Sequence, residues 1–324
     1  MKKHIYPFIP ALLIAILFTG CDNDVNLYAD YKEIPVVYGL LDFQNDTIWL
    51  KVTKAFSGPG NALEFAQNPD SSNYSSKLEV TLTGRKNGNN LPVITFDTIT
   101  IHNKNAGDSI FYYPDQLMYY STAKLDQEAE YTLKVKLNDK DITAKTKIVN
   151  NFHISYPVRT ISFTSDKEIK WNSAINGKRY EVDMIFHYKE LLPGTSDTLY
   201  KSISWHLGMK HSISTSGYEN MAIGYSGENF YKLLENKLEK ILNVERWTGN
   251  IDVYVACASQ ELDTYIEINN GSTGLLQEIP VFTNINGGVG LFASRHTVHQ
   301  SVPMTVTSER KLVEDYDLGF KFKQ

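Results

Sequence analysis

The sequence predicts a mainly β protein built from two β-sandwich-like domains, the second with one amphipathic helix and one short helix. Three observations support this fold class. Apolar and polar residues alternate with period two over most of the chain, turn residues recur about every ten positions, and helical periodicity is rare. At 324 residues, the chain is long enough for two domains that each have a core.

Residues 34–150 are predicted to form an immunoglobulin-like β-sandwich. The clearest element is EYTLKVKLNDKDITAKTKIV at 130–149, in which the turn NDKD joins two alternating strands. Each strand turns one apolar stripe toward a core and leaves its other face in water. The stretches at 47–53 and 78–83 alternate in the same way. Short strands separated by frequent turns are typical of a sandwich.

Residues 151–324 are predicted to form a fibronectin-like β domain with a helical insertion. The segment NNFHISYPV at 150–158 marks the boundary, because two asparagines end one strand and a proline interrupts the next. The alternating strand KRYEVDMIFHYKE at 178–190 follows a strand that carries Trp171. This pair of strands resembles the fibronectin-type sandwich, and the resemblance implies the fold of the second domain.

Two helices are expected inside the second domain. The stretch GENFYKLLENKLEKIL at 227–242 repeats its apolar residues at helical spacing, and Ser226 stands at the position of an N-cap. A shorter helix is predicted within SQELDTYIEINNG at 259–271, which ends in asparagine and glycine.

The first 20 residues have the layout of a signal peptide. Two lysines come first, an apolar stretch covers 5–18, and small residues precede Cys21. A spanning helix needs about 20 apolar residues. This stretch is shorter and contains Pro7 and Pro10, so a permanent transmembrane helix is not expected.

Residues 18–21, FTGC, resemble the recognition box of bacterial lipoprotein signals. The resemblance implies that Cys21 becomes the first mature residue, carries palmitate-type acyl chains and anchors the chain to the outer membrane through a tether at 21–33. Several acyl chains on one residue attach a protein stably. Asp22 and Asp24 resemble the surface-export signals of such lipoproteins, which implies exposure at the cell surface. The alternative is an ordinary secreted protein with a cysteine near its cleavage site.

The composition excludes one class of partner. The formal net charge is −5, and removal of the signal takes away two more lysines. No cluster of basic residues interrupts this acidic balance, so nucleic acid is not expected as a partner. The second of the two cysteines, Cys257, lies on the apolar side of an alternating strand and is predicted to be a buried free thiol.

Two glycine-containing motifs resemble catalytic signatures without their structural context. The segment GGVGLFA at 287–293 contains a formal G-x-G-x-x-A, but no helical pattern follows it, so a glycine turn between strands is the better interpretation. The segment GYSG at 224–227 is one residue short of a nucleophile elbow and shows no strand-to-helix context. No catalytic residues are therefore assigned, and the protein is not expected to be an enzyme or to use a cofactor.

The histidines do not form an evident metal site. His296 and His299 are three residues apart, but on a strand they would face opposite sides. His206 and His211 have no further ligand near them in the sequence, and His187 is expected simply to face solvent. The acids at 314–317 are expected to form a solvated turn before a last strand. No metal site is predicted.

Four tyrosines are the best candidates for a ligand or partner surface. They surround Pro114 in IFYYPDQLMYYSTAKL, residues 110–125, where a loop would offer rigid amphipathic contact area. The alternative is structural, since tyrosine is favoured in strands. The candidates are Tyr112, Tyr113, Tyr119 and Tyr120.

The C-terminal part resembles a known family. The helix at 261–270 followed by IPVFTNINGGVGLFAS at 279–294 is similar to the C-terminal signature of a family of uncharacterised Bacteroidetes-type outer-membrane lipoproteins, a domain of unknown function. Ala293 replaces the family's usual glycine. We expect this motif to close the second domain as a structural element. Its residues are Asn284, Gly287, Gly288, Gly290 and Phe292.

The resemblance also implies a function. Members are often encoded beside TonB-dependent transporters, which implies a non-catalytic accessory that binds a ligand or docks on a barrel transporter. The alternative is a structural or adhesive cell-surface lipoprotein with no transport partner. Asp-Thr and Asp-Ser pairs resemble the O-glycosylation acceptors of such bacteria, although Asp-Thr pairs also commonly open strands. The candidate acceptors are Thr47, Thr98, Ser109 and Thr198.

Overall fold

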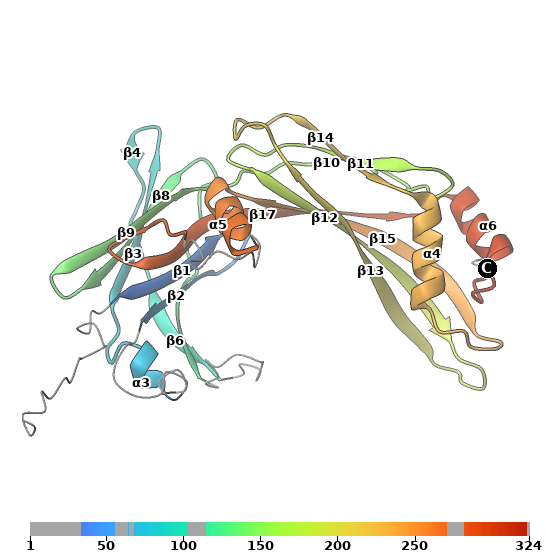
Figure 1. Cartoon of the computed structure of the whole chain (residues 1–324), viewed down its shortest axis with the longest axis horizontal. Coiled ribbons are helices and arrows are strands. Elements are labelled where there is room, and N and C mark those ends of the chain that lie inside the picture. Colours follow the sequence, from blue (N-terminus) through green and yellow to red (C-terminus); the bar gives the residue numbers. More distant parts are fainter. Residues whose placement is uncertain (1–33, 56–63, 65–67, 103–114, 271–281, 323–324) are drawn as a thin grey trace, which may run out of the picture.

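The computed structural model describes residues 34–55, 64, 68–102, 115–270 and 282–322. The described chain forms two β-sandwich lobes joined in an arch (Figure 1). The prediction of a mainly β protein is confirmed. Among the described residues, none of the helices has the length and hydrophobicity that would let it cross a membrane.

The N-terminal lobe has two facing sheets whose apolar sides share one core. One contains, in order, β6 (Asp97–Ile101), β7 (Gln116–Ser121), β2 (Ile48–Lys54), β1 (Pro35–Leu41) and the first part of β17 (Val289–Pro303). The other contains β16 (Ile285–Asn286), β9 (Lys140–Lys147), β8 (Glu130–Leu137), β3 (Glu79–Lys86) and β4 (Asn89–Asn90), with β5 (Ile94–Thr95) also paired to β3. The short helix α3 (Pro69–Ser72) precedes β3.

The C-terminal lobe sets three strands against four, an arrangement found in immunoglobulin-like sandwiches. The larger sheet contains β13 (Thr198–His211), β12 (Arg179–Leu191), β15 (Glu245–Ala258) and the second part of β17. The smaller contains β10 (Ile154–Tyr156), β11 (Lys167–Asn172) and β14 (Asn220–Tyr225). Trp171 of β11 is buried between these sheets. The strands β11 and β12, which suggested the fibronectin-like fold as a pair, therefore belong to opposite sheets and do not pair with each other. Cys257 is buried and free, as predicted.

Three helices accompany the C-terminal lobe: α4 (Gly227–Lys237), α5 (Gln260–Asn270) and α6 (Val306–Asp315). The expected helices α4 and α5 are present, but α4 ends at Lys237 because Leu238 is already extended. Ser226 is the N-cap of α4 by position, without a side-chain hydrogen bond. The helix α6 was not predicted, and Glu314 and Asp315 belong to its last turn rather than to a solvated turn.

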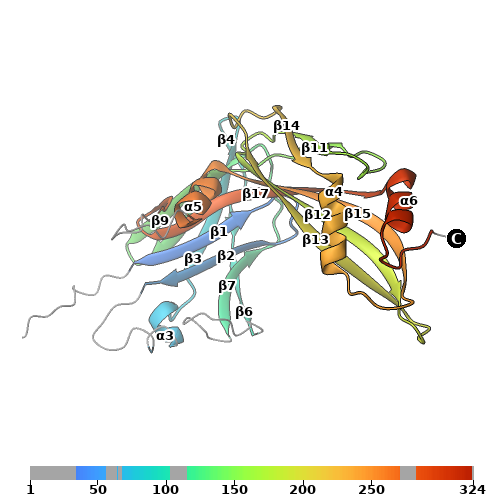
Figure 2. The same cartoon turned by 45° about the vertical axis from the view of Figure 1, so that its right-hand side comes forward.

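The long strand β17 belongs to both lobes (Figure 2). Residues 289–294 pair in parallel with β1, and residues 295–303 pair antiparallel with β15. One eight-stranded sheet therefore continues from one lobe into the other. The strand β16, just before it, pairs with β9. Residues 285–294 thus complete the N-terminal lobe, and the expectation that their motif closes the second domain is wrong.

The motif residues hold this join together. The side chain of Asn284 accepts a hydrogen bond from the backbone N–H of Phe292 at 2.9 Å and donates to the carbonyl oxygen of the same residue at 2.6 Å. The Phe292 ring is fully buried in the N-terminal core. Gly287 and Gly290 have positive φ angles of 83° and 121°, and a Cβ on Gly288 would lie 2.7 Å from the Pro35 carbonyl oxygen. The motif therefore has a structural role, as expected, but in the N-terminal lobe.

Candidate functional site

The predicted tyrosine surface is only partly realised. Tyr119 is fully buried, and its hydroxyl accepts a hydrogen bond from the backbone N–H of Leu78 at 3.0 Å. Burial raises the pKa of this hydroxyl. Tyr119 is therefore a core residue and not a contact residue. Tyr120 lies on the opposite face of β7 and is half-buried. Tyr112 and Tyr113 lie outside the described residues.

Tyr120 belongs to a group of aromatic side chains on the outer face of the N-terminal lobe. It is the cross-strand partner of Trp49, with ring centroids 5.8 Å apart. Trp49 is 41% exposed. On the neighbouring strand, Tyr38 is 42% exposed and meets Tyr265 of α5 edge-on at 6.4 Å. We call Tyr38, Trp49, Tyr120 and Tyr265 the aromatic patch.

One member of the aromatic patch, Trp49, can be recognised from the sequence pattern alone. In IWLKV at 48–52, Ile48, Leu50 and Val52 are the buried positions of β2, so Trp49 stands at a position that alternation assigns to water. A large aromatic on the wet face of a strand offers amphipathic contact area with few rotatable bonds. Tyr265 comes from α5, more than two hundred residues later, and no local pattern connects it to β1.

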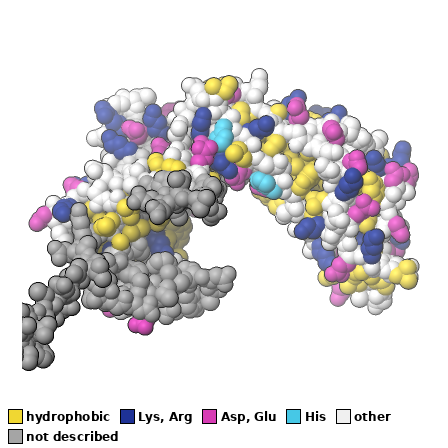
Figure 3. All heavy atoms as spheres, in the orientation of Figure 1, with side chains coloured by type: hydrophobic (Ala, Val, Ile, Leu, Met, Phe, Trp, Pro, Cys, Tyr) yellow, Lys and Arg dark blue, Asp and Glu magenta, His cyan; other side chains and the backbone are white. Residues whose placement is uncertain are grey.

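A second cluster lies on the outer face of the four-stranded sheet of the C-terminal lobe. Here each of four histidines contacts a carboxylate from another element. Figure 3 shows histidine side chains beside charged ones on the inner side of the bend between the lobes. His187 faces solvent as expected and also contacts an acid, while His206 and His211 have carboxylate partners that lie far away in the sequence. The pairs of this histidine–acid face are His187 with Asp252, His299 with Asp252, His206 with Asp183, and His211 with Asp263.

Asp252 is the centre of the first pair of contacts. Its two carboxylate oxygens lie 2.8 Å from Nε2 of His187 and 3.4 Å from Nε2 of His299. Burial would raise the pKa of Asp252, but hydrogen bonds from Ser301 and the two histidines outweigh burial and lower it. The ring of Tyr254 stacks on His299, with centroids 4.5 Å apart. Asp252 is thus held as a carboxylate between two imidazoles.

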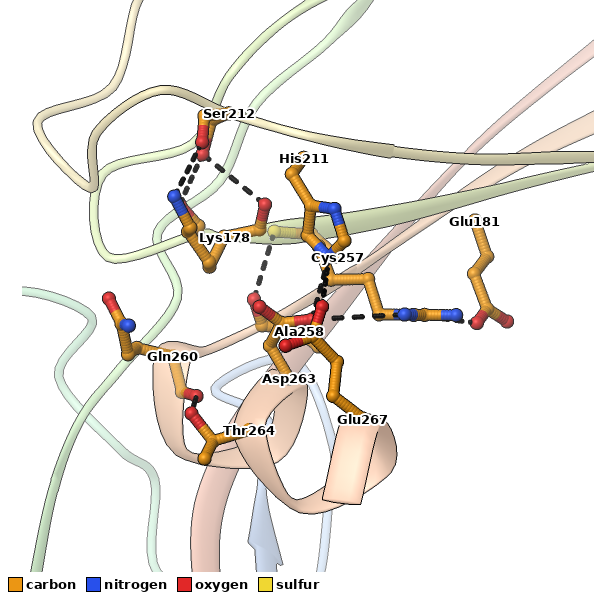
Figure 4. Close-up of polar contacts among 12 residues, drawn as sticks. Lys178, Glu181, His211, Ser212, Cys257, Ala258, Gln260, Asp263, Thr264 and Glu267 are labelled. Atoms are coloured by element: carbon orange, nitrogen blue, oxygen red, sulfur yellow. Dashed lines mark hydrogen bonds and ion pairs between the residues drawn. The ribbon is translucent and has the colours of Figure 1, made fainter. Parts of the chain in front are cut away.

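His211 has two carboxylate partners (Figure 4). It ends β13, and its Nε2 lies 2.8 Å from Oδ1 of Asp263 and 3.5 Å from Oε1 of Glu267. The two acids are one helical turn apart on α5 and point to the same nitrogen. Arg179, on the neighbouring strand, is 3.8 Å from Asp263 and donates its Nε–H to Glu181. Within the described ranges, this is the one group of three such side chains that could hold a metal ion.

His296 has a structural environment. It faces the opposite side of β17 from His299, as predicted, and is fully buried. Its two ring nitrogens lie 3.1 Å from Asp42 and 3.2 Å from Asn151. The ring of Phe43 packs at a centroid distance of 4.6 Å. These contacts join the end of β1, the start of the second lobe and the shared strand.

The remaining predicted sites have mixed outcomes. Cys21 and Ser109 lie outside the described residues. Thr47 and Thr98 are half-buried next to or within N-terminal strands, and Thr198 is exposed at the start of β13. The GGVGLFA segment continues into β17 and not into a helix, as expected.

The GYSG segment does have a strand-to-helix context, contrary to expectation, because β14 ends at Tyr225 and α4 begins at Gly227. In the described part of the chain, however, Ser226 between them makes no hydrogen bond to a histidine. The strand-to-helix context of a nucleophile elbow is therefore present, and among the described residues no base is hydrogen-bonded to the serine.

Comparisons with known proteins assign no family. No family model matches the chain, and no curated protein matches it. Among solved structures, the C-terminal globular domain of an oligosaccharyltransferase from Pyrococcus abyssi is 9% identical, with a TM-score of 0.22, over 65% of this chain and 44% of that one. A Bacteroides uniformis β-glucuronidase is 9% identical, with a TM-score of 0.12, over 79% of this chain and 26% of the enzyme. The chain thus spans less than half of either structure, and likenesses at these scores do not bear on function.

Proposed function

We propose that this protein is a non-catalytic outer-membrane lipoprotein that binds a ligand or docks on a barrel transporter as an accessory of TonB-dependent uptake. The observation that carries the proposal is the aromatic patch. Exposed tryptophan and tyrosine are enriched at recognition surfaces, where they contribute much of the binding free energy. Trp49 and Tyr38 each leave about two fifths of their surface in water.

The position of the aromatic patch fits an anchored protein. Two of its members lie on β1 and β2, the strands that directly follow the tether at 21–33. A short tether would keep these strands near the membrane surface, where a barrel transporter presents its loops. The partner would therefore meet the N-terminal lobe first.

Anchoring through Cys21 is tested by the Cys21→Ala variant. We expect it to lose acyl labelling and to leave the membrane fraction, because the proposed anchor is a lipid and the described helices include none that could span. The measurement is metabolic labelling with a fatty-acid analogue combined with fractionation. Membrane retention together with persistent labelling in the variant would contradict the lipoprotein assignment.

Docking through the aromatic patch is tested by Trp49→Ala. Removing a central aromatic contact typically costs at least about 2 kcal/mol of binding free energy, which corresponds to a roughly 30-fold loss of affinity. The measurement is affinity purification of the intact lipoprotein from gently solubilised outer membranes, with quantitative mass spectrometry of the proteins that accompany it.

The matched control is Tyr200→Ala, which removes a 79% exposed tyrosine from β13 in the other lobe. A barrel protein recovered in near-equal amount with the wild type and the control, but depleted with Trp49→Ala, would support the proposal. Equal recovery with the wild type and both variants would exclude the patch as the contact. Recovery of the lipoprotein alone would favour a structural or adhesive surface protein.

A further inference from the structure

The contacts around His211 exceed what a simple ion pair needs. Two carboxylates approach one ring nitrogen, although a nitrogen carries a single proton and donates it to one acceptor at a time. The Asp263 side chain is only 6% exposed, so its charge is largely removed from water. An isolated buried carboxylate is costly, and such groups are paired or coordinate metals. The arrangement therefore accommodates a cation with more than one ligand position.

The positions of the donor atoms fit a transition-metal ion. One nitrogen and two carboxylate oxygens all lie within 4.8 Å of one another. Zinc bonds to such atoms at about 2.0–2.2 Å, so the ligands of a tetrahedral site lie roughly 3.4 Å apart. The separations of 2.8 and 3.5 Å from Nε2 lie on either side of this value, and the two carboxylate oxygens lie within 4.8 Å of each other. Asp263 and Glu267 are spaced i, i+4 and so share one face of α5.

The charges around the donors fit the same interpretation. Two carboxylates balance a divalent ion, and a neutral imidazole completes a set of three protein ligands. Nη1 of Arg179 lies 3.8 Å from Asp263, and the Nε–H of the same guanidinium donates to Glu181 at 2.9 Å. It can orient the carboxylate from outside the ligand set, as outer partners do at metal sites. The other paired histidines lack this convergence, since His187 and His299 contact different oxygens of Asp252.

We infer that His211, Asp263 and Glu267 bind a divalent transition-metal ion, with Zn²⁺ as the best match to one imidazole and two carboxylates. Ions that prefer all-oxygen sites, such as Ca²⁺ and Mg²⁺, should bind more weakly because an imidazole nitrogen is a poor ligand for them. The site goes beyond the proposed docking function, and neither depends on the other.

Metal binding would fix α5 at the junction of the two lobes. The helix supplies two ligands to a site whose third ligand is on β13 of the C-terminal lobe. The same helix supplies Tyr265, which contacts Tyr38 of the N-terminal lobe. An ion bound here would therefore restrict the movement of α5, which contacts both lobes.

The test is competition between the mature protein and a chromophoric chelator for ZnCl₂ at neutral pH. We expect one ion per wild-type chain and at least about 100-fold weaker binding in Glu267→Gln and in His211→Asn, because each variant removes a direct ligand. The Glu267 side chain is 57% exposed, so its substitution should leave the metal-free fold intact. A thermal unfolding curve measured without metal checks this point.

The matched control is His206→Asn, which breaks a histidine–carboxylate pair on the same face that has a single acid, Asp183. This variant should bind Zn²⁺ as the wild type does. The inference would be overturned if Glu267→Gln and His211→Asn bound Zn²⁺ as tightly as the control. It would also be overturned if the wild type bound no more Zn²⁺ than the His211→Asn/Glu267→Gln double variant.

Discussion

Replacing Arg246 with methionine is expected to lower the free energy of unfolding by about 3–5 kcal/mol, the usual cost of removing one partner from a buried ion pair. Arg246 and Glu190 are each 1% exposed, and the guanidinium meets the carboxylate at 2.7–2.8 Å. Two further N–H groups donate to the carbonyl oxygens of Leu318 and Glu239. The variant would therefore leave Glu190 with Lys201 as its remaining cation and release two backbone segments. Urea unfolding measures the loss.

Two controls separate this effect from a general loss of charge. Lys321→Ala removes an exposed ion pair with Glu245 in the same region and should cost at most about 1 kcal/mol. Adding Glu190→Leu to Arg246→Met should recover part of the loss, because no uncompensated buried charge then remains. If Arg246→Met lowered the free energy of unfolding no more than Lys321→Ala, the buried ion pair would not be an important source of stability in this lobe.

The pH dependence of the same variant gives an independent check. Burial would raise the pKa of Glu190, but hydrogen bonds from Lys201 and Arg246 outweigh burial and lower it. The resulting stabilisation is present above the unfolded pKa of about 4.3. It is lost as the pH falls through the lowered folded pKa. The variant removes one of the two cations that lower this pKa, so less of this stabilisation remains, and the acid loss of stability should be smaller than in the wild type.

Replacing Gly290 with alanine is expected to cost about 2–6 kcal/mol, from backbone strain and steric overlap of about 1–3 kcal/mol each. Its φ of 121° is unfavourable for any residue with a side chain. A Cβ there would lie 2.0 Å from the carbonyl oxygen of Val37, its register partner on β1. The two strands would have to separate where β17 enters the N-terminal lobe. Urea unfolding of the variant measures the cost.

The matched control is Gly287→Ala, three residues earlier. Gly287 also has a positive φ, at 83°, but the nearest atom to its Cβ would be 3.7 Å away. Only the left-handed backbone is then penalised, at roughly 1–2 kcal/mol. Equal losses in the two variants would show that the close approach of β1 and β17 does not require glycine.

Much of the fold follows from local patterns in the sequence, but the join between the lobes does not. Alternation correctly identifies the hairpin of β8 and β9, helical spacing of apolar residues identifies α4, and the closing asparagine and glycine indicate α5. In β17, residues 290–294 are buried on both faces and lose the alternating pattern. The partners of a strand are chosen by tertiary contacts, so no local pattern reveals that β17 first pairs with β1 and then with β15.

The helix α6 illustrates a weaker local signal. Only Ser308 and Leu312 are buried in it, and Val306 is exposed, so its apolar periodicity is faint. The signal that remains is its cap, because the side chain of Thr305 accepts a hydrogen bond from the backbone N–H of Ser308.

The histidine–acid face could not be assembled from the sequence for a related reason. The partners of His206, His211 and His187 lie 23, 52 and 65 residues away, on other strands or on a helix. Sequence spacing of histidines reports only local geometry, and the acids meet them through strand register and the placement of α5. Trp49, by contrast, was detectable, since alternation alone places it on the outer face of β2.

The shared strand β17 also determines how the protein would bear a pulling force. If the chain is held by its N-terminus, as a lipid anchor at Cys21 would hold it, tension reaches the structure through the start of β1. The C-terminal lobe pulls on the far end of β17, which lies parallel to β1 over six residue pairs. Tension along parallel strands loaded at opposite ends shears their hydrogen bonds together, whereas peeling would break them one at a time. The pairing of β1 with β17 is thus oriented to resist a force that pulls the C-terminal lobe away from an N-terminal anchor.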